Sequence, residues 1–170
     1  MNALVPARAA VPVVSAEPAQ YLTFMLGGEV YAIGILAIKE IIEYHNLTEV
    51  PMMPACVRGV INLRGAVVPV VDLQARFGRP TSEITKRSCI VIVEASAGGE
   101  RQVIGVKVDA VNEVLDIDPA EIEPAPAFGA RIRGDFIQGM GKVKGRFVIL
   151  LHVENVLALE ELVPAAEAAA

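Results

Sequence analysis

One strongly basic side chain interrupts a run of apolar residues in the first half of the chain. The segment GVINLRGAVVPVVDL, residues 59–73, places Arg64 beside Gly65 with no carboxylate before Asp72. A second charge in apolar surroundings is Glu40, within IKEII at residues 38–42. A guanidinium can form two parallel hydrogen bonds to a carboxylate, a geometry that lysine cannot reproduce. These residues therefore point to recognition through an ion pair, with a solvated hairpin tip for Arg64 and simple strand alternation for Glu40 as the alternatives.

Residues that could support catalysis or bind a metal do not form a recognisable pattern. His45 and His152 are isolated, and His152 ends an apolar strand, where we expect a half-buried packing residue. Neither Cys56 nor Cys89 lies in a known nucleophile context, and no set of His, Cys, Asp and Glu has metal-ligand spacing. The glycine-rich stretch GMGKVKG at residues 139–145 fails as a phosphate-binding loop because no hydroxyl residue follows its first lysine. We expect no enzymatic activity, no metal and no cofactor.

Composition narrows the remaining classes of function. The 170 residues suffice for one domain or two small subdomains that share a core. Although 54% of the residues are hydrophobic, no uncharged apolar run approaches the ~18 residues of a membrane-spanning helix. The net charge of −5 argues against nucleic-acid binding, which favours a basic surface. Two widely separated cysteines suit a reducing compartment, so we expect a cytoplasmic protein.

Strand-forming segments and tight turns dominate the chain. In the first half we expect strands at 21–26 and 30–33, a helical turn leading into a strand over 35–42, strands at 60–63 and 67–71, and a short helix at 73–77 capped by Asp72. In the second half we expect strands at 89–93, 102–108, 113–117, 136–140 and 146–152, followed by a closing helix over 153–162.

The two halves resemble each other. GGEVYAIG at residues 27–34 matches GGERQVIG at 98–105, and Gly65 and Gly145 each precede an apolar strand and then a short helix. We therefore expect two copies of one unit, each with a hairpin, a linking strand and a second hairpin that ends in a helix. Short strands with this density of turns are typical of small β-barrels, because closure removes exposed sheet edges.

The segment at 59–73 closely resembles the hallmark segment of CheW-like domains. The resemblance extends through YLTFMLG at 21–27, PMMP at 51–54, Val108-Asp109 and PAP at 124–126 with Phe128, and it covers the chain from about Gln20 to Leu162. It implies a mainly β fold of two small five-stranded SH3-like β-barrels that share a hydrophobic seam, with short helices and a C-terminal helix. It also implies an adaptor that couples chemoreceptors to the histidine kinase CheA.

The resemblance implies two sets of binding residues. The residues that match positions for binding the receptor's cytoplasmic hairpin tip are Ile38, Glu40, Arg64, Gly105, Val111 and Val114. The residues that match positions for binding the kinase's regulatory domain are Arg58, Gly59, Glu123, Ala127 and Phe128. We further expect Glu40 and Arg64 to lie close together, because either charge alone in apolar surroundings would be unfavourable.

The expected organisation follows from these assignments. We expect a flexible tail over 1–19, the CheW-like domain over 20–163 and a disordered tail over 164–170. Within the domain, subdomain one spans about 20–84, subdomain two about 85–152 and the closing helix about 153–162. We expect a monomer that enters receptor–kinase arrays only with its partners, without inserting into the membrane. The alternative is an adaptor of the same fold in surface-motility signalling of the pilus type or in another chemosensory pathway.

Overall fold

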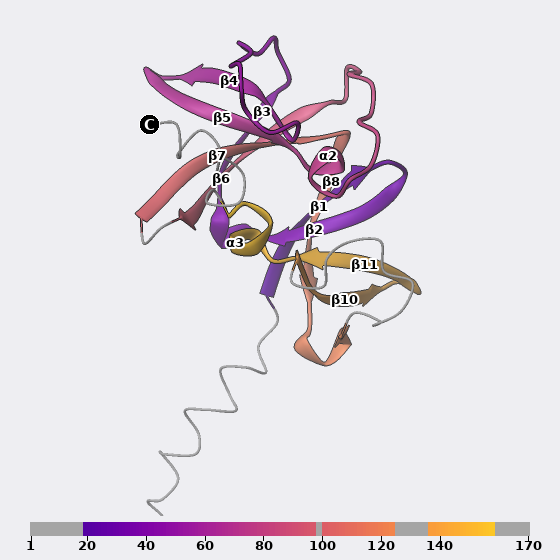
Figure 1. Ribbon diagram of the computed structural model, residues 1–170. Coiled ribbons are helices and arrows are strands. Elements are labelled where there is room, and N and C mark those ends of the chain that lie inside the picture. Colours follow the sequence, from indigo (N-terminus) through magenta and orange to yellow (C-terminus); the bar gives the residue numbers. More distant parts are fainter. Residues whose placement is uncertain (1–18, 98–99, 125–135, 159–170) are drawn as a thin grey trace, which may run out of the picture.

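The computed structural model describes residues 19–97, 100–124 and 136–158, and these segments form a mainly β fold of two sheets (Figure 1). The strands are β1 (Ala19–Leu26), β2 (Glu29–Gly34), β3 (Ile38–Glu43), β4 (Val57–Leu63), β5 (Ala66–Asp72), β6 (Cys89–Ala97), β7 (Glu100–Val108), β8 (Ala110–Ile117), β9 (Ile122–Glu123), β10 (Ile137–Val143) and β11 (Arg146–Leu151). The short helices are η1 (Ile35–Ala37), α2 (Leu73–Arg76), η2 (Pro119–Glu121) and α3 (Val153–Val156). The expected mainly β class is confirmed.

The two sheets draw their strands from different parts of the chain. The central sheet has the order β3-β6-β7-β5-β4, and the terminal sheet has the order β8-β1-β2-β11-β10-β9. Residues 38–108 thus supply the central sheet, while the segments before and after them supply the terminal sheet. This grouping differs from the expected division near residue 84. The terminal sheet has six strands rather than five because the two-residue β9 pairs with β10.

The expected internal repeat explains this grouping. Each copy contributes a first hairpin (β1–β2 or β6–β7), a linking strand (β3 or β8) and a second hairpin followed by a helix. The copies exchange their first hairpins: β5 pairs in parallel with β7, and β11 pairs in parallel with β2. The linking strands stay with the second hairpins of their own copies and pair with the exchanged hairpins, since β3 pairs with β6 and β8 pairs with β1. Both sheets are therefore built from both copies.

The second hairpins of the two copies turn in the same way. Arg64 and Gly65 have φ angles of 52° and 90°, and Lys144 and Gly145 have φ angles of 52° and 79°. Two central residues with positive φ define the turn whose twist matches that of a β-hairpin. In the first of these turns, the amide of Gly65 also donates to Oδ1 of Asn62 at 2.8 Å.

A single apolar cluster joins the two sheets. It includes Leu22 and Phe24 of the terminal sheet and Val91, Val93 and Val106 of the central sheet, all of them buried. Each sheet also has a smaller interior cluster, around Ile117 and Leu150 in the terminal sheet and around Ile61 and Ile90 in the central sheet. The sheets therefore share one hydrophobic seam, and burial of that seam is the main force that holds them together.

The helices that follow the second hairpins are short and capped. Asp72 caps α2 as expected, with Oδ1 accepting from the amides of Gln74 and Ala75. His152 occupies the same position before α3 and accepts from the amide of Asn155. His152 is exposed, so the expectation of a half-buried packing residue is wrong. The helix α3 ends at Val156, and the expected continuation beyond residue 158 lies outside the described residues. Within the described segments, no helix has both the length and the apolar character needed to span a membrane.

Candidate functional site

Glu40 and Arg64 form an ion pair, as expected from the sequence. Nη2 of Arg64 donates to Oε2 of Glu40, and Nη1 donates to Oε1 at 3.4 Å, so the two planar groups meet at two points. The side chain of Glu40 is 27% exposed, whereas that of Arg64 is 71% exposed. The carboxylate is thus shielded and holds one edge of the guanidinium, while the rest of the guanidinium faces solvent and is free to bind a partner.

The ion pair connects the two ends of the central sheet. Glu40 lies on β3, Arg64 lies in the turn after β4, and β3 and β4 are the outermost strands of that sheet. Close to the same junction, Thr48 and Val60 exchange backbone hydrogen bonds of 3.0 and 2.8 Å. The backbone on the two sides of the ion pair is held by strand pairing, since Glu40 pairs with Ile92 on β6 and Leu63 pairs with Ala66 across the turn that contains Arg64.

The other four expected receptor-binding residues have different environments. Ile38 and Val111 are partly buried against the shared apolar cluster. Val114 is half exposed on β8. Gly105 is buried inside the central sheet, where a Cβ atom would lie 2.8 Å from Cγ2 of Ile90 and 3.2 Å from Cγ2 of Val70. Gly105 on β7 thus leaves room for the side chains of Val70 on β5 and Ile90 on β6, and it contributes no side chain to the surface.

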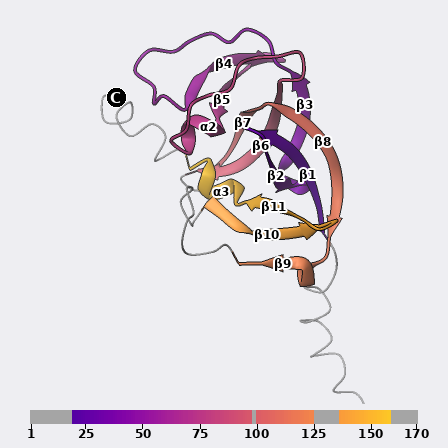
Figure 2. The same cartoon turned by 90° about the vertical axis from the view of Figure 1, so that its right-hand side faces the viewer.

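The expected kinase-binding residues lie in two separate places. Arg58 is exposed and Gly59 is buried, both on β4 of the central sheet. A Cβ atom at Gly59 would lie 2.6 Å from the carbonyl oxygen of Thr48, so only glycine permits the bridge between Thr48 and Val60. Glu123 is exposed on β9, and Figure 2 shows β4 and β9 at opposite ends of the molecule. Ala127 and Phe128 lie outside the described residues.

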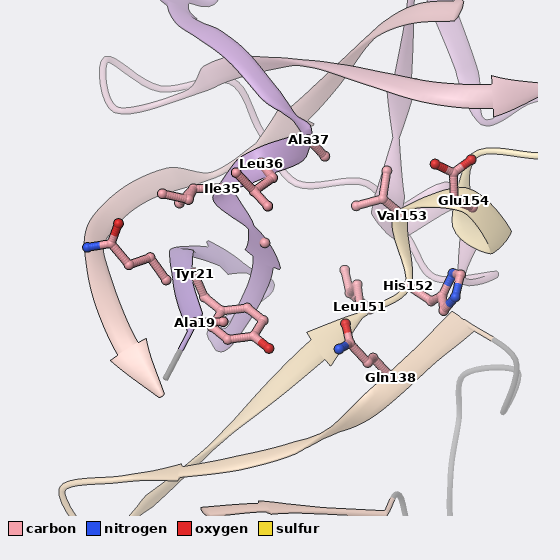
Figure 3. Close-up of a pocket in the computed structure, with 12 residues that line it drawn as sticks. Ala19, Tyr21, Ile35, Leu36, Ala37, Gln138, Leu151, His152, Val153 and Glu154 are labelled. Atoms are coloured by element: carbon pink, nitrogen blue, oxygen red, sulfur yellow. The ribbon is translucent and has the colours of Figure 1, made fainter. Parts of the chain in front are cut away.

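The structure adds an apolar groove that the sequence reasoning missed. We name it the η1–α3 groove; its volume is about 760 Å³. Figure 3 shows Ile35 and Leu36 of η1 on one side of it and Leu151, His152 and Val153 on the other. Leu36 is 97% exposed. The sequence contains a signal that could have revealed this groove. Turns are usually polar, but the turn between β2 and β3 consists of the apolar residues Ile35, Leu36 and Ala37.

The two cysteines are poorly suited to nucleophilic chemistry. Burial raises the pKa of the Cys56 thiol. Burial, with a smaller contribution from the charge of Glu43, raises the pKa of the Cys89 thiol. A raised pKa keeps a thiol protonated at neutral pH, and the thiolate is the reactive form. In the segments that the structure describes, no group of three or more His, Cys, Asp or Glu side chains could hold a metal ion.

Comparison with known proteins assigns almost the whole described fold to one group. The family model described as CheW-like domain matches residues 20–161. Chemotaxis protein CheW of Klebsiella aerogenes is 34% identical over 143 residues, which cover 84% of each chain. The crystal structure of the scaffolding protein TtCheW from Thermoanaerobacter tengcongensis superposes with a TM-score of 0.74 at 35% identity, covering 82% of this chain and 87% of that one. Protein PilI of Pseudomonas aeruginosa is 28% identical over 71 residues, covering 42% of this chain and 40% of PilI.

Proposed function

The chain belongs to the CheW-like domain family, and from that premise we propose that it is a non-enzymatic scaffolding adaptor that couples chemoreceptors to the histidine kinase CheA. Similarity to chemotaxis CheW proteins extends over most of the chain, whereas similarity to PilI covers less than half of it. This difference favours chemotaxis over surface motility of the pilus type. The observation that carries the proposal is the Glu40–Arg64 pair, which holds a guanidinium at the surface of a rigid sheet.

We propose that the receptor's helical hairpin tip binds across the Glu40–Arg64 pair and the exposed part of β8. The free donors of Arg64 suit the carboxylates and carbonyl oxygens of a helix. Val114 and the neighbouring half-buried Val111 offer apolar area on the linking strand of the other copy. The η1–α3 groove offers a further apolar surface to the same partner.

We propose that the kinase's regulatory domain docks at Arg58 on the central sheet and at Glu123 on the terminal sheet, with Phe128 as a further contact. Because β4 and β9 lie at opposite ends of the molecule (Figure 2), Arg58 and Glu123 supply two separate contacts rather than one continuous patch. The adaptor is then a cytoplasmic monomer that is recruited to membrane-bound receptors by its partners. Sedimentation of the purified chain at micromolar concentration, with a single species near 18.1 kDa, is the supporting result.

Reconstitution tests the proposal. Purified chain is added to a receptor cytoplasmic fragment displayed on vesicles together with CheA, and kinase autophosphorylation is followed with labelled ATP. The expected result is receptor-dependent stimulation that requires the chain, with all three proteins sedimenting together. Failure of the chain to bind either partner contradicts the proposal.

Phe128→Ala is expected to weaken binding of the kinase's regulatory domain by about 2 kcal/mol, or about 30-fold in Kd, because a buried aromatic anchor dominates many interfaces. The melting temperature should stay nearly constant. Titration calorimetry with the isolated regulatory domain measures the effect. Phe147→Ala serves as the control, since Phe147 is a half-exposed phenylalanine on β11. A collapse of the melting temperature in Phe128→Ala identifies Phe128 as a core residue and contradicts the proposed role.

Leu36→Ser is expected to weaken receptor binding with no loss of stability. A leucine that becomes buried on binding contributes about 1.5–3 kcal/mol, or about 10- to 150-fold in Kd. Because Leu36 is 97% exposed, its loss should change the free energy of unfolding by less than about 0.5 kcal/mol. Met52→Ser is the matched control, because Met52 is an equally prominent apolar side chain that does not line the groove. Equal receptor binding by both variants excludes the groove from the receptor interface.

A further inference from the structure

Four residues form a polar cluster where the two sheets meet, which we name the inter-sheet cluster: Gly27, Gln74, Ser82 and Asp109. Oδ2 of Asp109 accepts from the amide of Gly27 at 2.8 Å and from the hydroxyl of Ser82 at 3.0 Å. The same hydroxyl accepts from Nε2 of Gln74 at 2.6 Å. The amide of Asp109 donates to the carbonyl oxygen of Met25 at 2.9 Å. Both the backbone and the side chain of Asp109 are thus fixed to other elements.

The members of the inter-sheet cluster come from both sheets. Gly27 lies in the turn between β1 and β2 of the terminal sheet. Gln74 and Ser82 belong to α2 and the loop after it, which follow β5 of the central sheet. Asp109 is the single residue between β7 of the central sheet and β8 of the terminal sheet. Its carboxylate therefore bridges the two sheets at the point where the chain passes between them.

A second set of contacts anchors Ser82 to the central sheet. Its carbonyl oxygen accepts from Nζ of Lys107 at 3.0 Å, and Lys107 on β7 is almost fully buried. Lys107 in turn lies 3.9 Å from Oδ2 of Asp72 at the end of β5. Ser82 thus has a fixed position relative to the central sheet. Because Oδ2 of Asp109 accepts hydrogen bonds from both Ser82 and Gly27, the turn at Gly27 is held at a fixed position relative to Ser82.

Directional bonds have a specific use at this boundary. The apolar seam holds the two sheets together, but hydrophobic burial is non-directional and so constrains the angle between them less tightly than directional bonds do. Hydrogen bonds weaken steeply when their geometry is distorted, so the two that Oδ2 of Asp109 accepts from different sheets restrict that angle. The other oxygen, Oδ1 of Asp109, is buried with no partner among the described residues. A buried acceptor without a hydrogen bond lowers the stability of the fold. The carboxylate of Asp109 is therefore better suited to fixing the relative position of the sheets than to stabilising the protein.

We infer that Asp109 is a positioning residue that sets the orientation of β8 relative to the central sheet. The strand β8 begins at the next residue and carries Val111 and Val114, whereas the central sheet carries Glu40 and Arg64. A partner that contacts both groups requires them at a fixed separation and angle. This inference rests on the proposed function in assigning that partner as the receptor tip, but the effect on sheet orientation is independent of it.

The test compares Asp109→Ala with Asp109→Asn, which keeps an acceptor for Gly27 and Ser82. Residual dipolar couplings of the backbone amides report the angle between the two sheets in the absence of any partner. We expect Asp109→Ala to change that angle and to weaken binding of the receptor fragment about tenfold. Asp109→Asn should restore both the angle and receptor binding.

Each outcome of this comparison decides the inference. An unchanged angle in Asp109→Ala overturns it, and a changed angle with normal receptor binding overturns the link to coupling. If Asp109→Ala does not fold, Ser82→Ala replaces it, since it removes two hydrogen bonds of the cluster from a half-buried position. Thr81→Ala is its control, because the hydroxyl of the exposed Thr81 bonds only to the carbonyl oxygen of Ser82, at 3.3 Å, and to Nζ of Lys107, at 3.5 Å, and makes no bond to Asp109. If the wild-type chain binds no receptor fragment, the proposed function fails, while the dipolar couplings still test the positioning role.

Discussion

Replacing Arg64 by asparagine is expected to leave the protein as stable as wild type or more stable, while receptor-dependent kinase activation falls about 10- to 100-fold, the range for losing charge-assisted hydrogen bonds. Arg64 has a φ of 52°, a left-handed conformation that asparagine adopts more readily than arginine does. The substitution therefore favours the turn and removes the guanidinium. Urea unfolding and the reconstituted kinase assay measure the two effects on the same sample.

The internal repeat supplies a matched control for this prediction. Lys144 occupies the same turn position on the terminal sheet with the same φ of 52°. Lys144→Asn should therefore change stability in the same direction and leave kinase activation unaltered. Arg64→Lys should impair activation, because an ammonium cannot make the two-point contact with Glu40. Equal activation by wild type and Arg64→Asn identifies Arg64 as a solvated hairpin tip.

The contribution of the ion pair to folding is expected to be small. Because Arg64 is largely exposed, a double-mutant cycle on Glu40 and Arg64 should give a coupling free energy of about 0.5–1 kcal/mol. A coupling this small cannot account for a large loss of activation. The loss in Arg64→Asn is therefore attributed to the missing contact with the receptor rather than to a loosened sheet.

Asp72→Ala is expected to lower the free energy of unfolding by about 3–5 kcal/mol, the range for removing one partner of a buried ion pair. Asp72 has no exposed surface, and its Oδ2 lies 3.9 Å from Nζ of Lys107, which is equally inaccessible. Its Oδ1 caps α2. The substitution removes the cap and leaves a buried ammonium with only neutral partners. Urea unfolding monitored by circular dichroism gives the change.

Two further variants divide this effect into its parts. Asp72→Asn keeps an acceptor for the amide of Gln74 and removes the charge, so it isolates the contribution of the ion pair. Asp118→Ala removes an exposed cap of η2, where Oδ1 accepts from the amide of Ala120 at 2.9 Å. Its cost should be near the ~1 kcal/mol typical of caps. If Asp72→Ala costs no more than Asp118→Ala, the buried pair makes no net contribution to stability.

Local patterns predicted the individual elements well. The Gly-Gly turn after β1, the helical turn that leads into β3 and the Asp72 cap all occur where the sequence indicated them. Each depends on interactions among residues a few positions apart, which a sequence displays directly. The contact between Glu40 and Arg64 joins residues 24 positions apart, and it was predicted because an unpaired charge in apolar surroundings is unfavourable.

The sequence by itself determined the mainly β class, the repeated unit and the pairing of its two notable charges. Only the tertiary structure decided that the copies exchange their first hairpins, because alternating apolar patterns indicate a strand without naming its neighbour. Only the tertiary structure likewise decided which residues are buried: Gly105 is buried among the side chains of the central sheet, whereas Leu36 is almost fully exposed. The same applies to Asp109, whose carboxylate meets an amide 82 positions and a hydroxyl 27 positions away in sequence. Such contacts depend on how two sheets pack, and packing is set by the summed shape of many side chains rather than by any short segment.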